Sequence, residues 1–99
     1  MDTDWAAIQK AVEGIENGLG EWIVGRKNES GRRDLHSKVA DISHASADRF
    51  LHERVDNLSG LVSALFSERT NIERVKRKIR DECGRIRLYR LEQEKGKSL

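Results

Sequence analysis

The sequence predicts an all-α fold: an elongated helical hairpin or a small helical bundle with a long, coiled-coil-like C-terminal helix, assembled as a dimer. The 99 residues include no proline and only five aromatic residues, whereas a sheet of short strands needs more aromatic and turn-forming residues. Hydrophobic and charged residues each make up 36% of the chain, which is too apolar and too mixed in charge for full disorder. Apolar residues recur at spacings of three and four, the period of an amphipathic helix. A chain of this length is expected to form one domain.

The first predicted helix spans about residues 4–24, with Thr3 in the N-cap position. Its large apolar residues form a heptad seam at spacings of 3, 4, 3, 4 and 3: Trp5, Ile8, Val12, Ile15, Leu19 and Trp22. A second stripe holds small residues: Ala7, Ala11, Gly14 and Gly18. Because glycine is unfavourable inside a helix, its presence in this stripe indicates close packing. The helix is therefore predicted to pack on two sides.

The middle of the chain is predicted to form a loop, a short helix and a break. The loop covers residues 25–31, where glycine, asparagine and serine residues favour turns. The helix covers about residues 33–43, and its apolar face consists of Leu35, Val39 and Ile42. Residues 43–48 include no large apolar side chain, and the apolar pattern changes phase after them. A bend or break is expected there.

A long helix is predicted over about residues 49–92, followed by a short polar tail at 93–99. Apolar residues recur every seven positions: Leu51, Leu58, Leu65, Ile72, Ile79 and Ile86. Four residues after each of these stand, in order, Val55, Val62, Arg69, Lys76, Cys83 and Arg90. The second half of the seam therefore carries cations. The unbroken phase favours one continuous helix, which is too long for a compact monomer and predicts a homodimer. The alternative is a fresh helix after the capping box formed by residues 70–73.

Charge is distributed unevenly along the chain. Residues 1–25 carry a net charge of −4 and residues 55–99 a net charge of +4, although the whole chain is only +2. We expect the acidic first helix to pack against the basic last one, because buried cations are costly unless they are paired. The acidic first helix is unlike a membrane-surface helix, and no apolar run is long enough to span a bilayer, so no membrane contact is expected.

The candidate binding site is the basic segment of the long helix. Its cations are Arg69, Arg74, Lys76, Arg77, Lys78, Arg80, Arg85, Arg87 and Arg90. They are predicted to bind a protein partner or, alternatively, the phosphates of a nucleic acid. The basic-leucine-zipper arrangement does not fit, because its basic region precedes the zipper. Tyr89 is the one aromatic residue among them, so base stacking is poorly supported.

Other chemistry-bearing residues give weak signals. His44, Asp48 and His52 are spaced to share one helical face, which matches a metal site or a pH-sensitive patch, or else ordinary polar residues on the surface. Cys83 is expected to be a buried small hydrophobe, with an activated thiolate as the alternative. The sequence includes no nucleotide-binding motif, and we expect no catalytic residue, metal or cofactor.

The function predicted from these observations is non-enzymatic protein binding, as an adaptor, a chaperone-like protein or a small inhibitor of a larger assembly. The alternative is a nucleic-acid-associated protein that uses the basic helix. The single cysteine and the acidic start, which lacks the features of a signal peptide, favour the cytoplasm. The two heptad seams are the predicted self-association surface.

Overall fold

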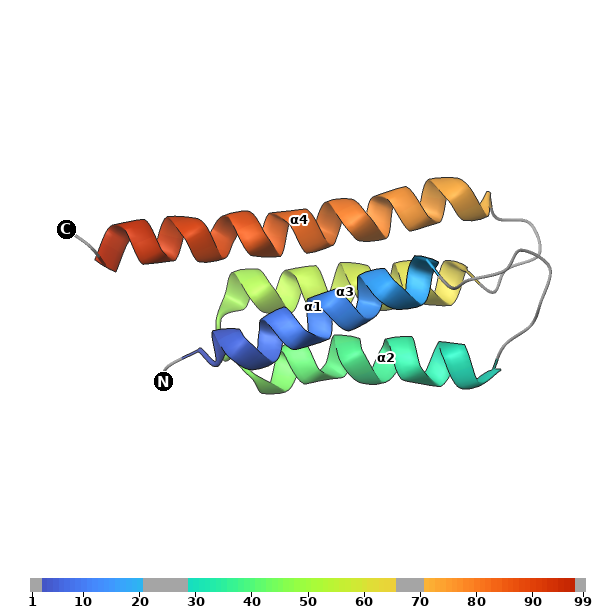
Figure 1. Ribbon diagram of the computed structural model, residues 1–99, viewed down its shortest axis with the longest axis horizontal. Helices are drawn as coiled ribbons and strands as arrows, with labels where there is room; N and C mark the ends of the chain where they lie inside the picture. Colours follow the sequence, from blue (N-terminus) through green and yellow to red (C-terminus); the bar gives the residue numbers. More distant parts are fainter. Residues whose placement is uncertain (1–2, 21–28, 66–70, 98–99) are drawn as a thin grey trace.

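The computed structural model describes residues 3–20, 29–65 and 71–97 of the chain. Over these ranges it contains four α-helices: α1 (Trp5–Gly20), α2 (Glu29–His44), α3 (Arg49–Ala64) and α4 (Ile72–Lys97). Successive helices run antiparallel, and the first and last described residues lie at the same end (Figure 1). The all-α prediction is confirmed, and the architecture is the bundle rather than the hairpin.

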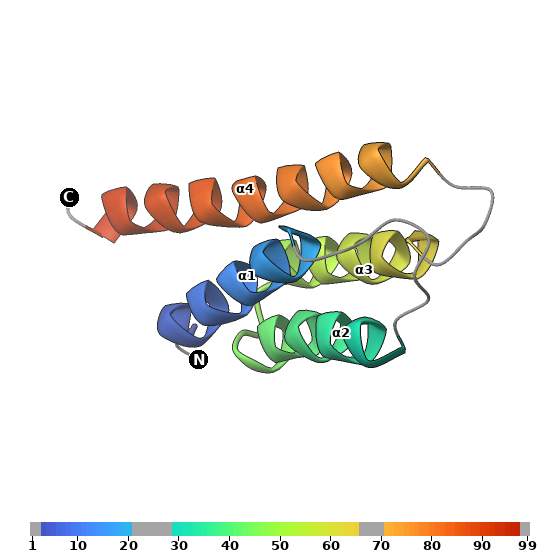
Figure 2. The same cartoon turned by 45° about the vertical axis from the view of Figure 1, so that its right-hand side comes forward.

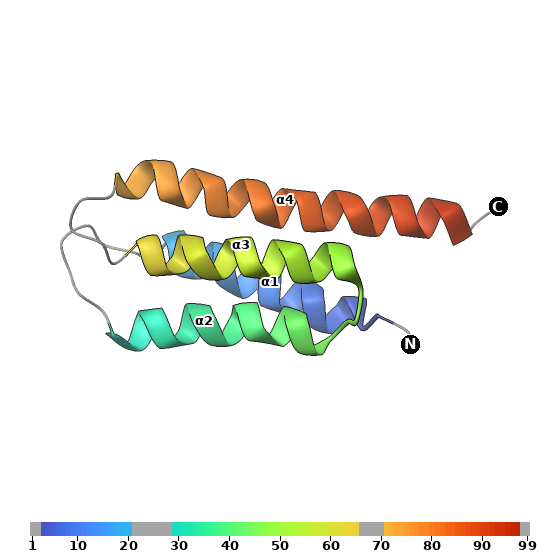
Figure 3. The ribbon, with the colours of Figure 1, turned by 180° about the vertical axis from the view of Figure 1, so that it is seen from behind.

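Each helix packs against two neighbours in a square arrangement. The neighbouring pairs are α1–α2, α2–α3, α3–α4 and α1–α4, whereas the backbones of the diagonal pairs stay more than 8 Å apart, Cα to Cα, over the described residues. Figure 3 shows the far side, with α3 lying between α2 and α4. The core is formed by one apolar face from each helix, including Ile15, Leu35, Leu58 and Ile79, all 2% exposed or less. The result is an up-down-up-down bundle measuring 49 × 21 × 20 Å.

Helix α1 matches its predicted two-sided packing. The large seam residues Ile8, Val12, Ile15 and Leu19 are buried, and Ala11 of the small stripe is also buried. Gly14 and Gly18 face α2, where they meet the side chains of Lys38 and Leu35. The N-cap differs from the prediction, because Asp4 Oδ1 accepts the backbone N–H of Ala7 at 3.1 Å. The Thr3 hydroxyl instead shares a 2.9 Å hydrogen bond with Ser46. Residues 21–24 and Trp22 lie outside the described residues.

The predicted break near 43–48 is confirmed. Helix α2 ends at His44, and α3 begins after Asp48, whose Oδ1 accepts the backbone N–H groups of Phe50 and Leu51. This N-cap satisfies backbone donors that the first turn leaves unpaired. The loop predicted over 25–31 is too long at its end, because α2 already begins at Glu29. Residues 25–28 lie outside the described residues.

The single helix predicted over 49–92 is wrong. Helix α3 ends at Ala64, and α4 begins at Ile72 and returns antiparallel beside it (Figure 1). Asn71 caps α4 through a 3.2 Å hydrogen bond from the N–H of Arg74, so the alternative of a fresh helix near residue 71 is the correct one. The seven-residue spacing continues from α3 into α4 because each helix buries its apolar seam residues in the same core. An unbroken spacing of apolar residues therefore does not show that the helix itself is unbroken.

The polar tail predicted at 93–99 is also wrong in part, because α4 continues to Lys97. At 26 residues it is ten residues longer than each of the other helices. At 1.5 Å per residue this adds about 15 Å of helix. Figure 1 shows the C-terminal turns of α4 extending past the end of the bundle. These turns therefore lack a full set of neighbouring helices.

Candidate protein-binding surface

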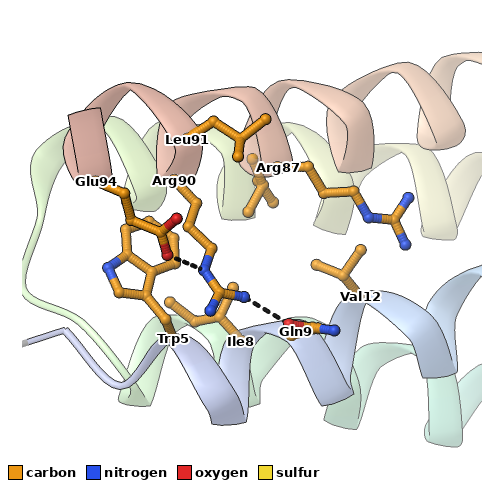
Figure 4. A pocket seen from close by; sticks show the side chains of 9 residues that line it. Trp5, Ile8, Gln9, Val12, Arg87, Arg90, Leu91 and Glu94 are labelled. Carbon is orange, nitrogen blue, oxygen red and sulfur yellow. Dashed lines mark hydrogen bonds and ion pairs between the residues drawn. The ribbon is translucent and has the colours of Figure 1, made fainter.

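A groove lies between α1 and α4 at the end of the bundle where Trp5 is located. Helix α1 slants away from α4 toward Trp5, which both Figure 1 and Figure 2 show. The groove encloses about 290 Å³, and Figure 4 shows its side chains. Its lining comes from α1 and α4: Trp5, Ile8, Gln9, Val12, Ile86, Arg87, Arg90, Leu91 and Glu94. Five of these nine residues are apolar, and Arg90 extends across the groove from α4 to Gln9 of α1 (Figure 4).

Two arginines of α4 hold the groove walls together. Arg90 donates to Glu94 Oε1 at 2.9 Å and to Gln9 Oε1 of α1 at 2.5 Å (Figure 4). Arg87 makes a two-bond ion pair with Glu16 of α1. This hydrogen bonding raises the pKa of the Arg87 guanidinium. The predicted packing of an acidic first helix on a basic last helix is thus confirmed within one chain.

Two leucines lie on the exposed surface of α4 next to this groove. Leu88 is 57% exposed and Leu91 is 53% exposed, and they are the exposed large hydrophobic residues within the described ranges. Leu91 also lines the groove. The seam analysis missed both leucines because they fall outside the repeated heptad positions. The signal that could have found them is their spacing of three on the side of the helix opposite Ile79.

The structure divides the predicted basic site into three groups. Arg85, Arg87 and Arg90 form ion pairs with Glu82, Glu16 and Glu94 respectively. Lys76 is buried, with its Nζ 3.9 Å from Glu73, as expected for a cation in the seam. The third group is exposed and makes no ion pair within the described residues: Arg74, Arg77, Lys78 and Arg80. Arg69 lies outside the described residues. The predicted site is therefore not one continuous basic stripe.

The predicted self-association seam lies mostly inside a single chain. Ile8, Val12, Ile15, Leu19, Leu51, Leu58, Leu65, Ile79 and Ile86 are buried in its core. Trp5 and Ile72 pack against that core. The argument for a dimer from an unpaired seam therefore no longer applies. A homodimer would need a different surface.

An aromatic cluster joins three helices at the Trp5 end of the bundle. The rings of Phe50 and Tyr89 are stacked at 4.4 Å, and the Trp5 ring lies 6.1 Å from Tyr89. Tyr89 donates its hydroxyl to Asp48 Oδ2 at 2.5 Å, which ties α4 to the N-cap of α3. That hydrogen bond, with burial and the Asp48 charge, raises the pKa of Tyr89 to about 12. Tyr89 therefore has a structural role in place of the base stacking considered from the sequence.

The histidine face suggested by the sequence does not form a shared site. His52 Nε2 lies 2.7 Å from the backbone oxygen of Ser46, while Asp48 caps α3 and accepts from Tyr89. His44 is exposed at the last turn of α2. Within the described ranges, no group of three metal-binding side chains is arranged to hold an ion.

Cys83 of α4 is buried in the core, as expected for a small hydrophobic residue. Burial, with the nearby Glu16 and Glu82 charges, raises the pKa of its thiol to about 12. The thiol is therefore neutral near pH 7 and is a poor nucleophile.

Comparisons with known proteins give no family assignment. No protein-family model matches the chain, and neither a curated protein nor a solved structure matches it. Among the helices at 3–20, 29–65 and 71–97, none is both long and apolar enough to cross a lipid bilayer.

Proposed function

We propose that the chain is a non-enzymatic protein-interaction module, acting as an adaptor, a chaperone-like protein or a small inhibitor of a larger assembly. Its binding surface consists of the α1–α4 groove together with Leu88 and Leu91. The observation that carries this proposal is an open apolar groove that continues into two exposed leucines on one helix. Such an apolar surface, on a bundle whose other described large aliphatic residues are buried or partly buried, is typical of a site for another protein.

The shape of α4 supports the same proposal. Helix α4 is ten residues longer than each of the other helices, and its C-terminal turns extend past the end of the bundle (Figure 1). Leu91 lies two residues after Tyr89, which contacts Asp48 at the start of α3. The Arg90 contact to Gln9 joins the two walls of the groove, and its contact to Glu94 fixes the Arg90 side chain. A preformed groove reduces the ordering cost of binding.

The shifted titratable groups are not activated nucleophiles. The pKa values of Cys83 and Tyr89 are raised to about 12, further from neutral pH than their ordinary values of 9.0 and 10.0. The Arg87 guanidinium forms an ion pair with Glu16. The shifts therefore make these groups less reactive, whereas catalytic groups are usually shifted toward their working pH. The single buried thiol also accords with a cytoplasmic location.

Photo-cross-linking tests the proposal. A photoreactive phenylalanine analogue replaces Leu91 in one variant and Asp56 of α3 in a control variant, and both are expressed in cells. We expect a discrete protein adduct from position 91 and not from position 56. The adducted protein is then purified, and its affinity for the wild-type chain and for Leu91→Glu is measured by calorimetry. The proposal predicts a loss of about tenfold or more in the variant, and equal affinities would contradict it.

A second function, nucleic-acid binding, has one observation in its favour. Arg74, Arg77, Lys78 and Arg80 are exposed and make no ion pair within the described residues. Fluorescence anisotropy with a labelled duplex DNA and a labelled RNA tests this function. Phosphate contacts predict an affinity that falls steeply between low and moderate salt, and that weakens when Arg77 and Arg80 become glutamate but not when Leu91 does.

A further inference from the structure

The outer face of α4 carries a regular stripe that the bundle does not use. Five exposed residues follow one another at spacings of 3, 4, 4 and 3: Arg77, Arg80, Gly84, Leu88 and Leu91. These spacings keep all five on one side of the helix, away from buried Ile79 and Ile86. Leu91, the last of these five, also lines the α1–α4 groove. The spacing of the stripe is that of a face on which another helix packs, and no helix among the described residues packs there.

Gly84 at the centre of this stripe packs against no side chain of the described residues. Glycine is unfavourable inside a helix, because its backbone loses more freedom on folding than that of other residues. A Cβ built on Gly84 would meet nothing within 4 Å. By contrast, Gly18 lies against Leu35, so its small size serves the packing of α1 on α2. A bare position on an exposed helical face lets the backbone of another helix approach closely.

The charges along the stripe indicate what such a helix would carry. Arg77 and Arg80 are exposed and make no ion pair within the described residues. Residues 72–97 hold ten basic and five acidic residues, a net charge of +5. A second copy of α4 would bring like charges together, whereas an acidic helix would be complementary. The leucines at the other end need apolar contacts, so the complementary helix is amphipathic.

We infer that the partner docks an acidic amphipathic helix on this stripe, crossing α4 at Gly84. Its apolar residues contact Leu88, Leu91 and the groove, and its carboxylates meet Arg77 and Arg80. This inference rests on the proposed protein-binding function and adds the chemistry and position of the docking element. The mode is that of a helix laid against a complementary helical face.

A displayed library of helical peptides of random sequence tests the chemistry of the partner. The full chain is the bait, at moderate salt, and the selected peptides are sequenced. We expect them to be acidic and to space their apolar residues by three and four. Selected peptides that are neutral or basic would overturn the inference, even if they bind the groove.

Matched variants test the position of the crossing with the best selected peptide as the probe. Gly84→Ala is expected to raise the melting temperature of the chain but to weaken peptide binding by about tenfold, because the added methyl keeps the helices apart. Gly60→Ala in α3 is the control, since its Cβ would also meet nothing within 4 Å. It should raise the melting temperature without changing the affinity. Equal affinities for the wild type and Gly84→Ala would overturn the proposed crossing point.

Charge-reversal variants complete the test. Arg77→Glu and Arg80→Glu are each expected to weaken the acidic peptide about tenfold, and the loss should shrink as salt is raised. Arg33→Glu on the exposed surface of α2 is the control and should leave the affinity unchanged. Unchanged affinity in both α4 variants would contradict the inference.

The outcomes separate this inference from the broader function. One outcome is a cross-linked partner that loses affinity for Leu91→Glu but binds Gly84→Ala, Arg77→Glu and Arg80→Glu as tightly as the wild type. That result supports the protein-binding function and rejects the acidic helix. Salt-sensitive binding to DNA or RNA that depends on Arg77 and Arg80, without any peptide or protein ligand, rejects both. A selected peptide that matches a segment of this chain would point to a second copy as the occupant and would overturn the inference.

Discussion

Glycine residues in this bundle fall into two kinds, which differ in what surrounds them. Gly60 has open space around its missing Cβ, whereas a Cβ on Gly18 would lie 3.0 Å from the Leu35 side chain. Leu35 is 2% exposed and belongs to the core, so it has little room to move.

We therefore predict opposite outcomes for two alanine substitutions. Gly60→Ala should raise the free energy of unfolding by up to about 1 kcal/mol, the gain in helix propensity. Gly18→Ala should lose that gain, because Leu35 must shift in a close-packed interior. Urea unfolding followed by circular dichroism measures both values. An equal gain in the two variants would contradict the packing role of Gly18.

Cys83 and Tyr89 make the stability sensitive to alkaline pH. Burial raises the thiol pKa from 9.0 to about 12, and the hydrogen bond to Asp48 raises the tyrosine pKa from 10.0 to about 12. In both cases the unfolded chain releases the proton at a lower pH than the folded chain. Their contribution is fully present below about pH 9 and is lost as the pH rises toward about 12.

The free energy of unfolding should therefore fall between about pH 9 and about pH 12, and less steeply in Cys83→Val. Tyr89→Phe should start from a lower stability, because it loses the bond to Asp48, but should also show a shallower decline. Urea titrations at several pH values measure these slopes. Wild-type and variant curves that run parallel would refute the assignment.

Single residues were predicted well where the reason was local. Cys83 was expected in the core because it occupies a seam position, and it is buried. The role of Asp48 was missed, because its contacts are the N-cap of α3 and a tyrosine 41 residues away. Sequence spacing shows which residues share a helical face, but it does not show which residues meet across the bundle.

At the scale of elements, one ion pair links α3 to α4 in a nearly dry environment. Arg54 Nη1 lies 3.2 Å from Glu82 Oε2, and the two side chains are 15% and 10% exposed. Arg54 also lies over the Phe50 ring at 5.1 Å. Removing one partner leaves the other charge buried, which usually costs more than the pair contributes.

We predict that Arg54→Ala lowers the free energy of unfolding by about 3 kcal/mol. The double variant Arg54→Met with Glu82→Leu should return to within about 1 kcal/mol of the wild type, or above it, because no buried charge is left unpaired. Arg85, which also pairs with Glu82, is largely exposed and can be hydrated. Guanidinium unfolding of the wild type, the two single variants and the double variant gives these differences. A double variant that is no more stable than the single variants would contradict this prediction.

The helices were easier to predict than their junctions. The break before α3 was recognised because residues 43–48 lack large apolar side chains, and the structure places the turn there. The junction between α3 and α4 was misjudged because Leu65 and Ile72 keep the seven-residue spacing across it. The decisive local signal was the capping pattern near Asn71, which outweighs an uninterrupted apolar phase.

At the scale of the whole molecule, the packing of four helices in one chain changes the expected mass in solution. The seam that predicted a homodimer is filled by the chain's own helices. We therefore expect a mass near 11.3 kDa, the mass of one chain, from size-exclusion chromatography with light scattering at moderate salt. Twice that mass would support the predicted homodimer and would place its interface outside the buried seam.

The α1–α2, α2–α3 and α3–α4 contacts join helices that are neighbours in sequence, whereas α1 and α4 meet across most of the chain. The Glu16–Arg87 and Gln9–Arg90 contacts span 71 and 81 residues. Closing so long a loop costs more entropy than forming a local hairpin. The α1–α4 face should therefore be the last part of the bundle to assemble and the first to open.

In native-state hydrogen exchange we expect the amides of α1 to show a lower free energy of opening than those at the centre of α3. A partner seated in the groove would then act as a latch on the bundle, slowing exchange in α1 as it binds.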